Sequence, residues 1–197
     1  MSLLLPATRQ PSSAVPRPYT FSGNQESTLG GPSTPVIRMG DRLALDMVIT
    51  RMTHAEAAIW LSVLMRAISE DARAPFPQPG ITIGTPGAAT IDGAGQTGSS
   101  LALKTMTAGY VVRQGQWFHI LQGGKRYLHH ATAPGTVDGA GKVVLSIWPM
   151  LRIVTVNSSP CDFVAPQIEG QLIGAEAGIP LVRARAESIK LSIVERE

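Results

Sequence analysis

The chain has 197 residues, a formal net charge of +3 at pH 7 and 16% charged residues, whereas a soluble domain typically has about 25% charged residues. Hydrophobic residues make up 44% of the chain, which also holds 20 glycines and 15 prolines. This composition excludes a disordered charged tail, a coiled coil and a disulfide-stapled miniprotein. It favours one turn-rich, mostly β domain whose surface is partly covered by neighbouring molecules.

The positive charge is spread along the chain, whereas a nucleic-acid-binding protein gathers Lys and Arg on one face. The densest basic groups are one pair and three residues near the C-terminus: Lys125-Arg126, Arg183, Arg185 and Lys190. We therefore expect no sequence-specific binding of nucleic acid. No run of about 18 apolar residues occurs, and the leucines at 3–5 follow no basic stretch. We accordingly expect neither membrane insertion nor a signal peptide.

Four prolines interrupt residues 1–18: Pro6, Pro11, Pro16 and Pro18. Proline cannot join a helix interior or a central strand, so we expect an extended arm that is disordered alone or lies against a neighbouring subunit. After this arm we expect a strand-strand-helix lobe at 19–80 and a β-rich lobe at 81–197, packed together as one compact domain. The first lobe has a turn at Gly30-Gly31-Pro32 and a short extended segment at 35–39.

A strand and a helix are the clearest elements of the first lobe. Apolar residues occupy every second position from Leu43 to Ile49, which predicts a half-buried strand. Thr53-His54-Ala55-Glu56 fits a capping box, in which the Thr and Glu side chains each bond the backbone N–H of the other residue. An apolar stripe at helical spacing follows: Ile59, Trp60, Val63, Leu64, Ala67 and Ile68. We expect Trp60 on this stripe to lie in the core.

The rest of the chain favours short strands. Pro75 to Pro79 excludes regular structure, and a Gly-rich stretch covers 80–100. Candidate strands then recur at short intervals: 101–106, 110–113, 117–121, 126–130, 143–148, 153–157 and 188–194. Turn dipeptides separate them: Gln114-Gly115, Gly123-Gly124, Asp138-Gly139 and Asn157-Ser158. We predict a mostly β fold, a β-sandwich or small β-barrel, with one capped amphipathic helix and the extended N-terminal arm.

Residues Gly93 to Gly98 match the letters of a dinucleotide-binding loop, G-x-G-x-x-G. Such a loop needs a helix directly after it and an acid about 20 residues further on. Here a β-like segment follows, and the next acid is Asp138. Asp92-Gly93-Ala94-Gly95 also recurs as Asp138-Gly139-Ala140-Gly141, which indicates a hairpin turn. We expect a turn or mobile loop without a nucleotide. The Gly141-Lys142 pair lacks the flanking residues of a phosphate-binding loop.

Residues that could perform chemistry are few. His119, His129 and His130 could meet on neighbouring strands, but alternation sends His129 and His130 to opposite faces, so we expect surface or edge histidines and no metal site. His54, in the first turn of the helix, should face solvent. Cys161 has no base beside it in the sequence, and we expect a buried or incidental thiol.

No nucleophile elbow of the form G-x-S-x-G occurs. Together with the scattered histidines and the isolated thiol, this leaves no complete catalytic set. We expect no catalytic, cofactor-binding or metal-binding residues, and a protein that is not an enzyme. A pair of carboxylates among the 14 acids stays open as an alternative, because spacing in the sequence does not show which acids meet.

Two stretches of the sequence together carry turn and packing motifs that resemble those of a known protein family. The first runs from a glycine turn to the capped helix: Ser27-Thr28-Leu29-Gly30-Gly31, Arg38-Met39-Gly40-Asp41-Arg42 and Met52-Thr53. The second lies in the β-rich part: 108–118, Gly124-Lys125-Arg126-Tyr127-Leu128 and 143–152, with Ile147-Trp148-Pro149-Met150-Leu151-Arg152. Together they resemble the structural tail proteins of long-tailed bacteriophages and prophages, above all the distal tail protein. The likeness covers about residues 19 to 195 and consists of packing and turn motifs.

The resemblance implies a β-rich, non-catalytic subunit of the tail tip in the virion, assembled in the bacterial cytoplasm. It implies a homo-oligomeric, hexameric ring around the DNA channel that joins the tail tube to the hub complex. Its partners would be further copies of itself, the tail tube protein, the hub or tip proteins and the tape-measure protein. Larger distal tail proteins carry an added carbohydrate-binding domain, for which this chain has no obvious segment.

Two other classes stay open at this stage. One is another virion ring protein, such as a tail tube, terminator or connector, which the copy number per virion would separate from a tail-tip ring. The other is a β-sandwich carbohydrate-binding module. A monomeric protein that binds glycans would favour this class.

Overall fold

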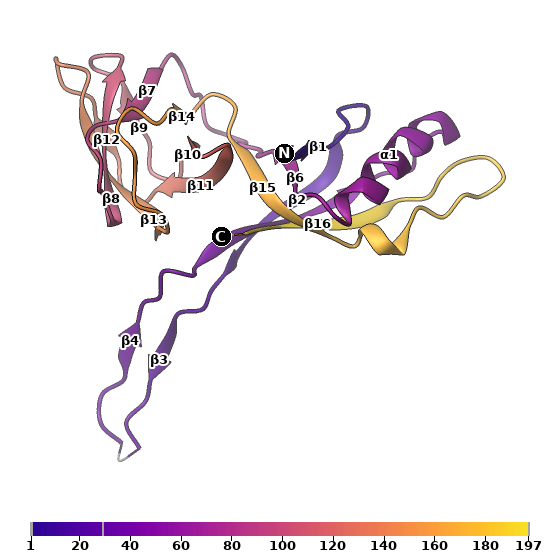
Figure 1. Cartoon of the computed structure of the whole chain (residues 1–197), viewed down its shortest axis with the longest axis horizontal. Helices are drawn as coiled ribbons and strands as arrows, with labels where there is room; N and C mark the ends of the chain where they lie inside the picture. The colour runs from indigo at the N-terminus through magenta and orange to yellow at the C-terminus, as the bar shows by residue number, and fades with distance from the viewer. Residues whose placement is uncertain (1, 29, 197) are drawn as a thin grey trace.

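The computed structural model describes residues 2–28 and 30–196. Met1, Leu29 and Glu197, which belong to the expected arm, the glycine-turn motif and the expected second lobe, lie outside the described residues. Two six-stranded sheets, an α-helix and a long hairpin make up most of the described molecule, together with a small two-stranded sheet and a short 3-10 helix, and the hairpin projects away from both large sheets (Figure 1). The mostly β fold, with one α-helix in the described residues, confirms the prediction from the sequence.

The first sheet has the strand order β1-β6-β15-β16-β5-β2. In that order its strands are Leu3–Leu4, Ala72–Pro75, Gln167–Ile173, Ile189–Glu195, Arg42–Ile49 and Pro11–Tyr19. Segments from near both ends of the chain therefore meet in one sheet. Every second residue of β5 from Leu43 to Ile49 is at most 3% exposed, which confirms the half-buried strand.

Helix α1, His54–Ala67, packs on this sheet and begins as the sequence predicts. The Glu56 N–H donates to Thr53 Oγ1 at 3.3 Å, and Glu56 Oε2 accepts from the Thr53 N–H at 2.8 Å. Trp60 is 1% exposed, which confirms it as a core residue. The expected apolar stripe is wrong at Ile59 and Ile68, because the helix buries a narrower face: Ala57, Trp60, Leu64 and Ala67. No helix of the described residues has the length and apolarity to cross a membrane.

The second sheet has the strand order β14-β10-β11-β13-β8-β7 and curls into a nearly closed barrel. In that order its strands are Cys161–Asp162, Trp117–Gln122, Lys125–Ala131, Val143–Leu151, Gly98–Met106 and Gly87–Ile91. Its two edges approach each other at Ile91, whose N–H donates to Ser159 O and whose carbonyl accepts from the Ser158 N–H, both at 3.0 Å. The barrel encloses its own apolar core, which includes Phe118 and Phe163.

Two of the expected strands differ in the structure. The segment 110–113 is reduced to β9 (Val111–Val112), which pairs with β12 (Gly135–Thr136). The prediction of a strand at 153–157 is wrong. Val154 and Val156 are exposed, and the carbonyl of Thr155 accepts the N–H of Gly95 in a neighbouring loop.

The Pro-rich N-terminal segment is part of the chain's own sheet, so the expected arm at 1–18 is corrected. β2 pairs with β5 along its length, with Pro18 opposite Leu43 and Val15 opposite Asp46. Pro16 and Pro18 are tolerated because β2 is an edge strand, where the missing N–H groups face away from β5. The segment that projects from the molecule is instead the next one along the chain, in which β3 (Gly23–Gln25) and β4 (Thr34–Val36) form a hairpin.

Aromatic rings and a buried ion pair join the barrel to the first sheet. Phe76, just after β6, lies 4.5 Å from Trp117 of β10, measured between ring centroids. Leu128 of β11 belongs to the core of the first sheet rather than to that of the barrel. Arg152 Nη2, after β13, lies 3.1 Å from Glu195 Oε2 of β16.

Candidate functional site

The three barrel histidines lie on β10 and β11. His129 packs toward Phe118 and the barrel core, whereas His130 lies 4.7 Å from Trp117 in the joint between the sheets, so the prediction of opposite faces is confirmed. The expectation of surface or edge histidines is wrong for His119 and His129, which are 5% and 1% exposed. The sequence does not reveal that the first sheet covers the outside of β10, which carries His119, or that His129 of β11 faces the interior of the barrel.

Each buried histidine bonds to the backbone. His119 Nδ1 accepts the N–H of Gln167 at 3.2 Å, and His129 Nδ1 lies 2.8 Å from Pro149 O. Burial lowers the pKa of His119 to about 4 and that of His129 to about 3, and it also lowers the pKa of His130. These are neutral structural side chains, and in the described residues no group of three His, Cys, Asp or Glu could hold a metal ion.

Cys161 is a buried thiol at the start of β14, as the sequence predicts. Its Sγ lies 3.8 Å from Ser159 O, and burial raises the pKa of the thiol to about 12. A thiol with such a pKa stays protonated and is a poor nucleophile.

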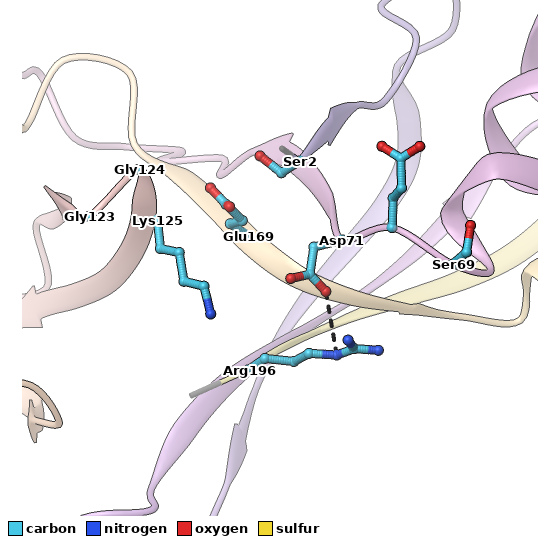
Figure 2. A pocket seen from close by; sticks show the side chains of 9 residues that line it. Ser2, Ser69, Asp71, Gly123, Gly124, Lys125, Glu169 and Arg196 are labelled. Carbon is cyan, nitrogen blue, oxygen red and sulfur yellow. Dashed lines mark ion pairs between the residues drawn. The ribbon is translucent and has the colours of Figure 1, made fainter.

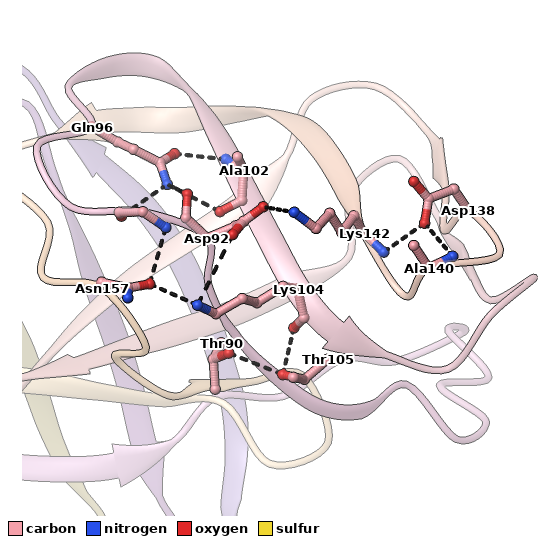
Figure 3. Close-up of polar contacts among 11 residues, drawn as sticks. Thr90, Asp92, Gln96, Ala102, Lys104, Thr105, Asp138, Ala140, Lys142 and Asn157 are labelled. Atoms are coloured by element: carbon pink, nitrogen blue, oxygen red, sulfur yellow. Dashed lines mark hydrogen bonds and ion pairs between the residues drawn. The ribbon is translucent and has the colours of Figure 1, made fainter.

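The Gly-rich loop at 93–98 is held by Gln96, as Figure 3 shows, and by Thr155 and Asn157, which accept backbone N–H groups of the loop. Gln96 Nε2 donates to Asp92 O and Ala102 O at 2.9 and 3.1 Å, while Gln96 Oε1 accepts the Ala102 N–H at 2.7 Å. The loop leads into strand β8 and not into a helix, so it lacks the helix N-terminus on which a pyrophosphate would bind. Beside it, Asp92 is paired with Lys142 at 2.8 Å.

A cleft of about 580 Å³ lies where the barrel meets the first sheet (Figure 2). Lys125 and the Gly123-Gly124 turn of the barrel face Glu169, Asp71 and Arg196 of the first sheet and its flanks. The charges are largely matched, since Arg196 Nε lies 3.4 Å from Asp71 Oδ1 and Arg126 Nη1 lies 3.0 Å from Glu169 Oε2. Neither histidine nor cysteine is among the described residues that line it. The cleft therefore has the groups of a packed joint and no activated nucleophile.

The projecting hairpin, residues 20–40, which we call the arm, has a rigid root. Asp41, 6% exposed, accepts the N–H groups of Phe21 and Ser22 at 2.7 and 3.0 Å and the Ser22 hydroxyl at 2.7 Å. Burial opposes the charge of Asp41, but the bonds from Ser22 and Phe21 outweigh it and lower its pKa. The Arg42 guanidinium lies 5.0 Å from the Phe21 ring. These contacts fix the direction in which the arm leaves β2 and β5.

The arm is nearly uncharged, and its exposed apolar side chains gather near its root, where the Arg38 N–H donates to Ser22 Oγ at 2.8 Å. Phe21, Val36, Ile37 and Met39 are 43%, 36%, 70% and 58% exposed. Glu26 and Arg38 are the charged residues in the sequence of the arm. A ribbon that extends into solvent with such side chains has the properties of a surface that another molecule covers.

No protein-family model matches the chain, and no curated protein matches it either. The likeness to phage tail proteins therefore stays a prediction from the sequence motifs.

The sequence missed the arm although its signals were present. A glycine turn at 30–31 lies between two short polar or Pro-containing segments, which is the pattern of a hairpin, but our prediction from the sequence has only the turn and a short extended segment at 35–39, and does not pair that segment with the one before the turn. The signal that could have located it is the glycine turn at 30–31 between two segments of similar length, of which the second carries Val36, Ile37 and Met39.

Proposed function

We propose that the protein is a structural, non-catalytic subunit of a bacteriophage tail tip, a distal tail protein that forms a ring between the tail tube and the hub. The observation that carries the assembly part of this proposal is the arm, whose apolar side chains project into solvent from a rigid root. The tail-tip part rests on the resemblance of the two motif-bearing stretches described above.

The arm supports assembly on energetic grounds. Burying Val36, Ile37 and Met39 against another molecule would contribute about 25 cal/mol for each Å² of apolar surface removed from water. The contacts of Asp41 already fix the root, so less conformational entropy is lost on binding than for a flexible tail. The arm therefore fills the role that the sequence had assigned to residues 1–18.

The edges of the first sheet favour the arm over strand addition as the means of assembly. The outer edge is β2, where Pro16 and Pro18 lack the N–H groups that a new strand would need. The opposite edge is β1, which has two residues. Contacts between copies are accordingly expected from side chains of the arm and not from a continuous sheet.

Replacing residues 23–36 by Asn-Gly, together with Ile37→Ser and Met39→Ser, tests the assembly part, because it removes both the hairpin and the exposed apolar side chains at its base. This dipeptide forms a two-residue turn between paired strands, and Ser22 and Asp41 keep their contacts at the root. We expect the full chain to give rings by mass photometry and light scattering, and the shortened variant to stay monomeric with an unchanged circular dichroism spectrum.

A matched control replaces the exposed Val154 and Val156 by serine, which removes apolar surface from the barrel and should leave assembly intact. A shortened variant that assembles as completely as the full chain would contradict the role of the arm. Imaging of isolated tail tips tests the phage assignment, since tips without this chain, or with a copy number unrelated to the symmetry of the tube, would refute it.

A further inference from the structure

An apolar groove lies on the helix side of the first sheet. It consists of two adjoining hollows of about 80 and 190 Å³ that share Gln10, Pro11, Met47 and Pro75. Leu5 and Trp60 line the smaller hollow, and Ala14 and Phe76 line the larger one. Arg9 is the charged residue among the described residues that line the groove. Both hollows are smaller than the roughly 300 Å³ of a typical small-molecule site, so the groove suits apolar side chains of a protein.

Two hydrogen-bond donors of the groove lack partners. The Nε1–H of Trp60 and the Nε–H of Arg9 are buried and bond to no other group among the described residues. A buried donor without a partner costs about 1–3 kcal/mol, so an occupant whose carbonyl oxygens reach these N–H groups after a small shift of the two side chains would relieve this cost. The groove is therefore suited to an extended, largely apolar segment whose carbonyl oxygens are free to accept hydrogen bonds.

The arm offers these groups, with Arg38 as the one charged residue among 36–39. It presents Val36, Ile37 and Met39, and its Pro32 and Pro35 have carbonyl acceptors but no N–H donor. We propose that the arm of one copy docks in the groove of a second copy of the chain, an inference that rests on the proposed ring and specifies its contact.

The arm of a chain cannot reach the groove of the same chain. The groove reaches along β2 as far as Ala14, and the arm leaves β2 at Tyr19. These five residues of strand span about 17 Å, and the arm continues away from β1 and α1 (Figure 1). The contact therefore joins two different surfaces of neighbouring copies, head to tail. Such a contact closes into a ring when its rotation closes and otherwise forms a filament.

Disulfide trapping tests this contact directly. The one native cysteine, Cys161, is buried with a pKa raised to about 12, so it should not interfere. Gln10→Cys places a thiol in the groove, and Ile37→Cys places one on the arm. A mixture of the two full-length single variants under mild oxidation should give a covalent dimer of one chain of each kind. The double variant should give a ladder of cross-linked species.

Val154→Cys, exposed on the barrel at 64% compared with 70% for Ile37, is the matched control and should not cross-link to Gln10→Cys. Trp60→Phe keeps an aromatic ring but removes the N–H. We expect it to weaken association of the full chain about five-fold, as for the loss of one ordinary hydrogen bond.

The outcomes separate this inference from the proposed function. If oligomers form but the cross-link between the cysteines at positions 10 and 37 does not, the docking of the arm in the groove is wrong. The proposed ring is unaffected by that result. A chain that stays monomeric and shows no such cross-link at any concentration would overturn the docking. The presence of the chain in imaged tail tips would still decide the phage assignment. Cross-linking of the Val154→Cys control at the same rate would also overturn the docking, because the trap would then report random collisions.

Discussion

At the scale of single residues, the barrel histidines connect burial to stability. His129 has a pKa of about 3 in the folded protein because burial disfavours its charged form, whereas the ordinary value is 6.5. Below pH 6.5 the unfolded chain binds a proton at this position that the folded chain does not bind. The contribution of His129 to stability is therefore complete above that pH and is lost as the pH falls toward 3.

We predict that His129→Gln reduces the dependence of stability on pH. The wild-type chain should lose about 2 kcal/mol of unfolding free energy through His129 between about pH 6.5 and about pH 5, measured by guanidinium denaturation. Glutamine keeps an N–H donor for Pro149 O but does not titrate in this range. The control is His54→Gln, which changes an exposed histidine of α1. Equal slopes in both variants would contradict the assignment.

At the scale of elements, the capping box determines where α1 begins. Thr53 Oγ1 accepts the Glu56 N–H, which otherwise has no partner in the first turn. Thr53→Ala should lower the free energy of unfolding by about 1 kcal/mol, measured by urea denaturation. Thr53→Ser, which keeps the hydroxyl, should restore most of the loss. If serine and alanine are equally destabilising, the effect comes from the threonine methyl group and not from the cap.

The elements that the sequence predicted correctly are those with local causes. The capped helix, the alternation in β5 and the four turns at 114–115, 123–124, 138–139 and 157–158 depend on neighbours in the chain. β2 and the arm depend on distant partners. β2 is a strand because β5 offers it an edge, although its prolines argue against a strand.

The candidate surfaces could not be predicted from the sequence, because they too depend on contacts between distant segments. The groove exists only because residues 4–11, β5, Trp60 and the end of β6 meet in space. The burial of His119 likewise depends on the contact between the two sheets, and that of His129 depends on the closure of the barrel around Phe118. The absence of a catalytic set was expected from the sequence, and that expectation stays a prediction.

At the scale of the whole molecule, Glu195 connects the barrel to the first sheet. Its carboxylate accepts the N–H of Leu43 in β5 at 3.1 Å and that of Leu128 in β11 at 2.8 Å, and it lies 3.1 Å from Arg152. The side chains of Glu195 and Arg152 are 1% and 3% exposed. The joint between the barrel and the first sheet is therefore fixed by a buried ion pair and two buried hydrogen bonds.

We predict that Glu195→Ala destabilises the chain by about 3–5 kcal/mol, because it leaves the Arg152 charge buried without its partner. Two backbone N–H groups would also lose their acceptor. Trp117 and Trp148 pack at the joint, so guanidinium denaturation followed by tryptophan fluorescence would report its loss. The matched control is Glu70→Ala, which removes an exposed pair with Arg66 and should cost about 0.5 kcal/mol or less. If the two variants lose the same stability, the buried pair does not hold the barrel and the first sheet together, and the aromatic contacts between Phe76 and Trp117 must do so instead.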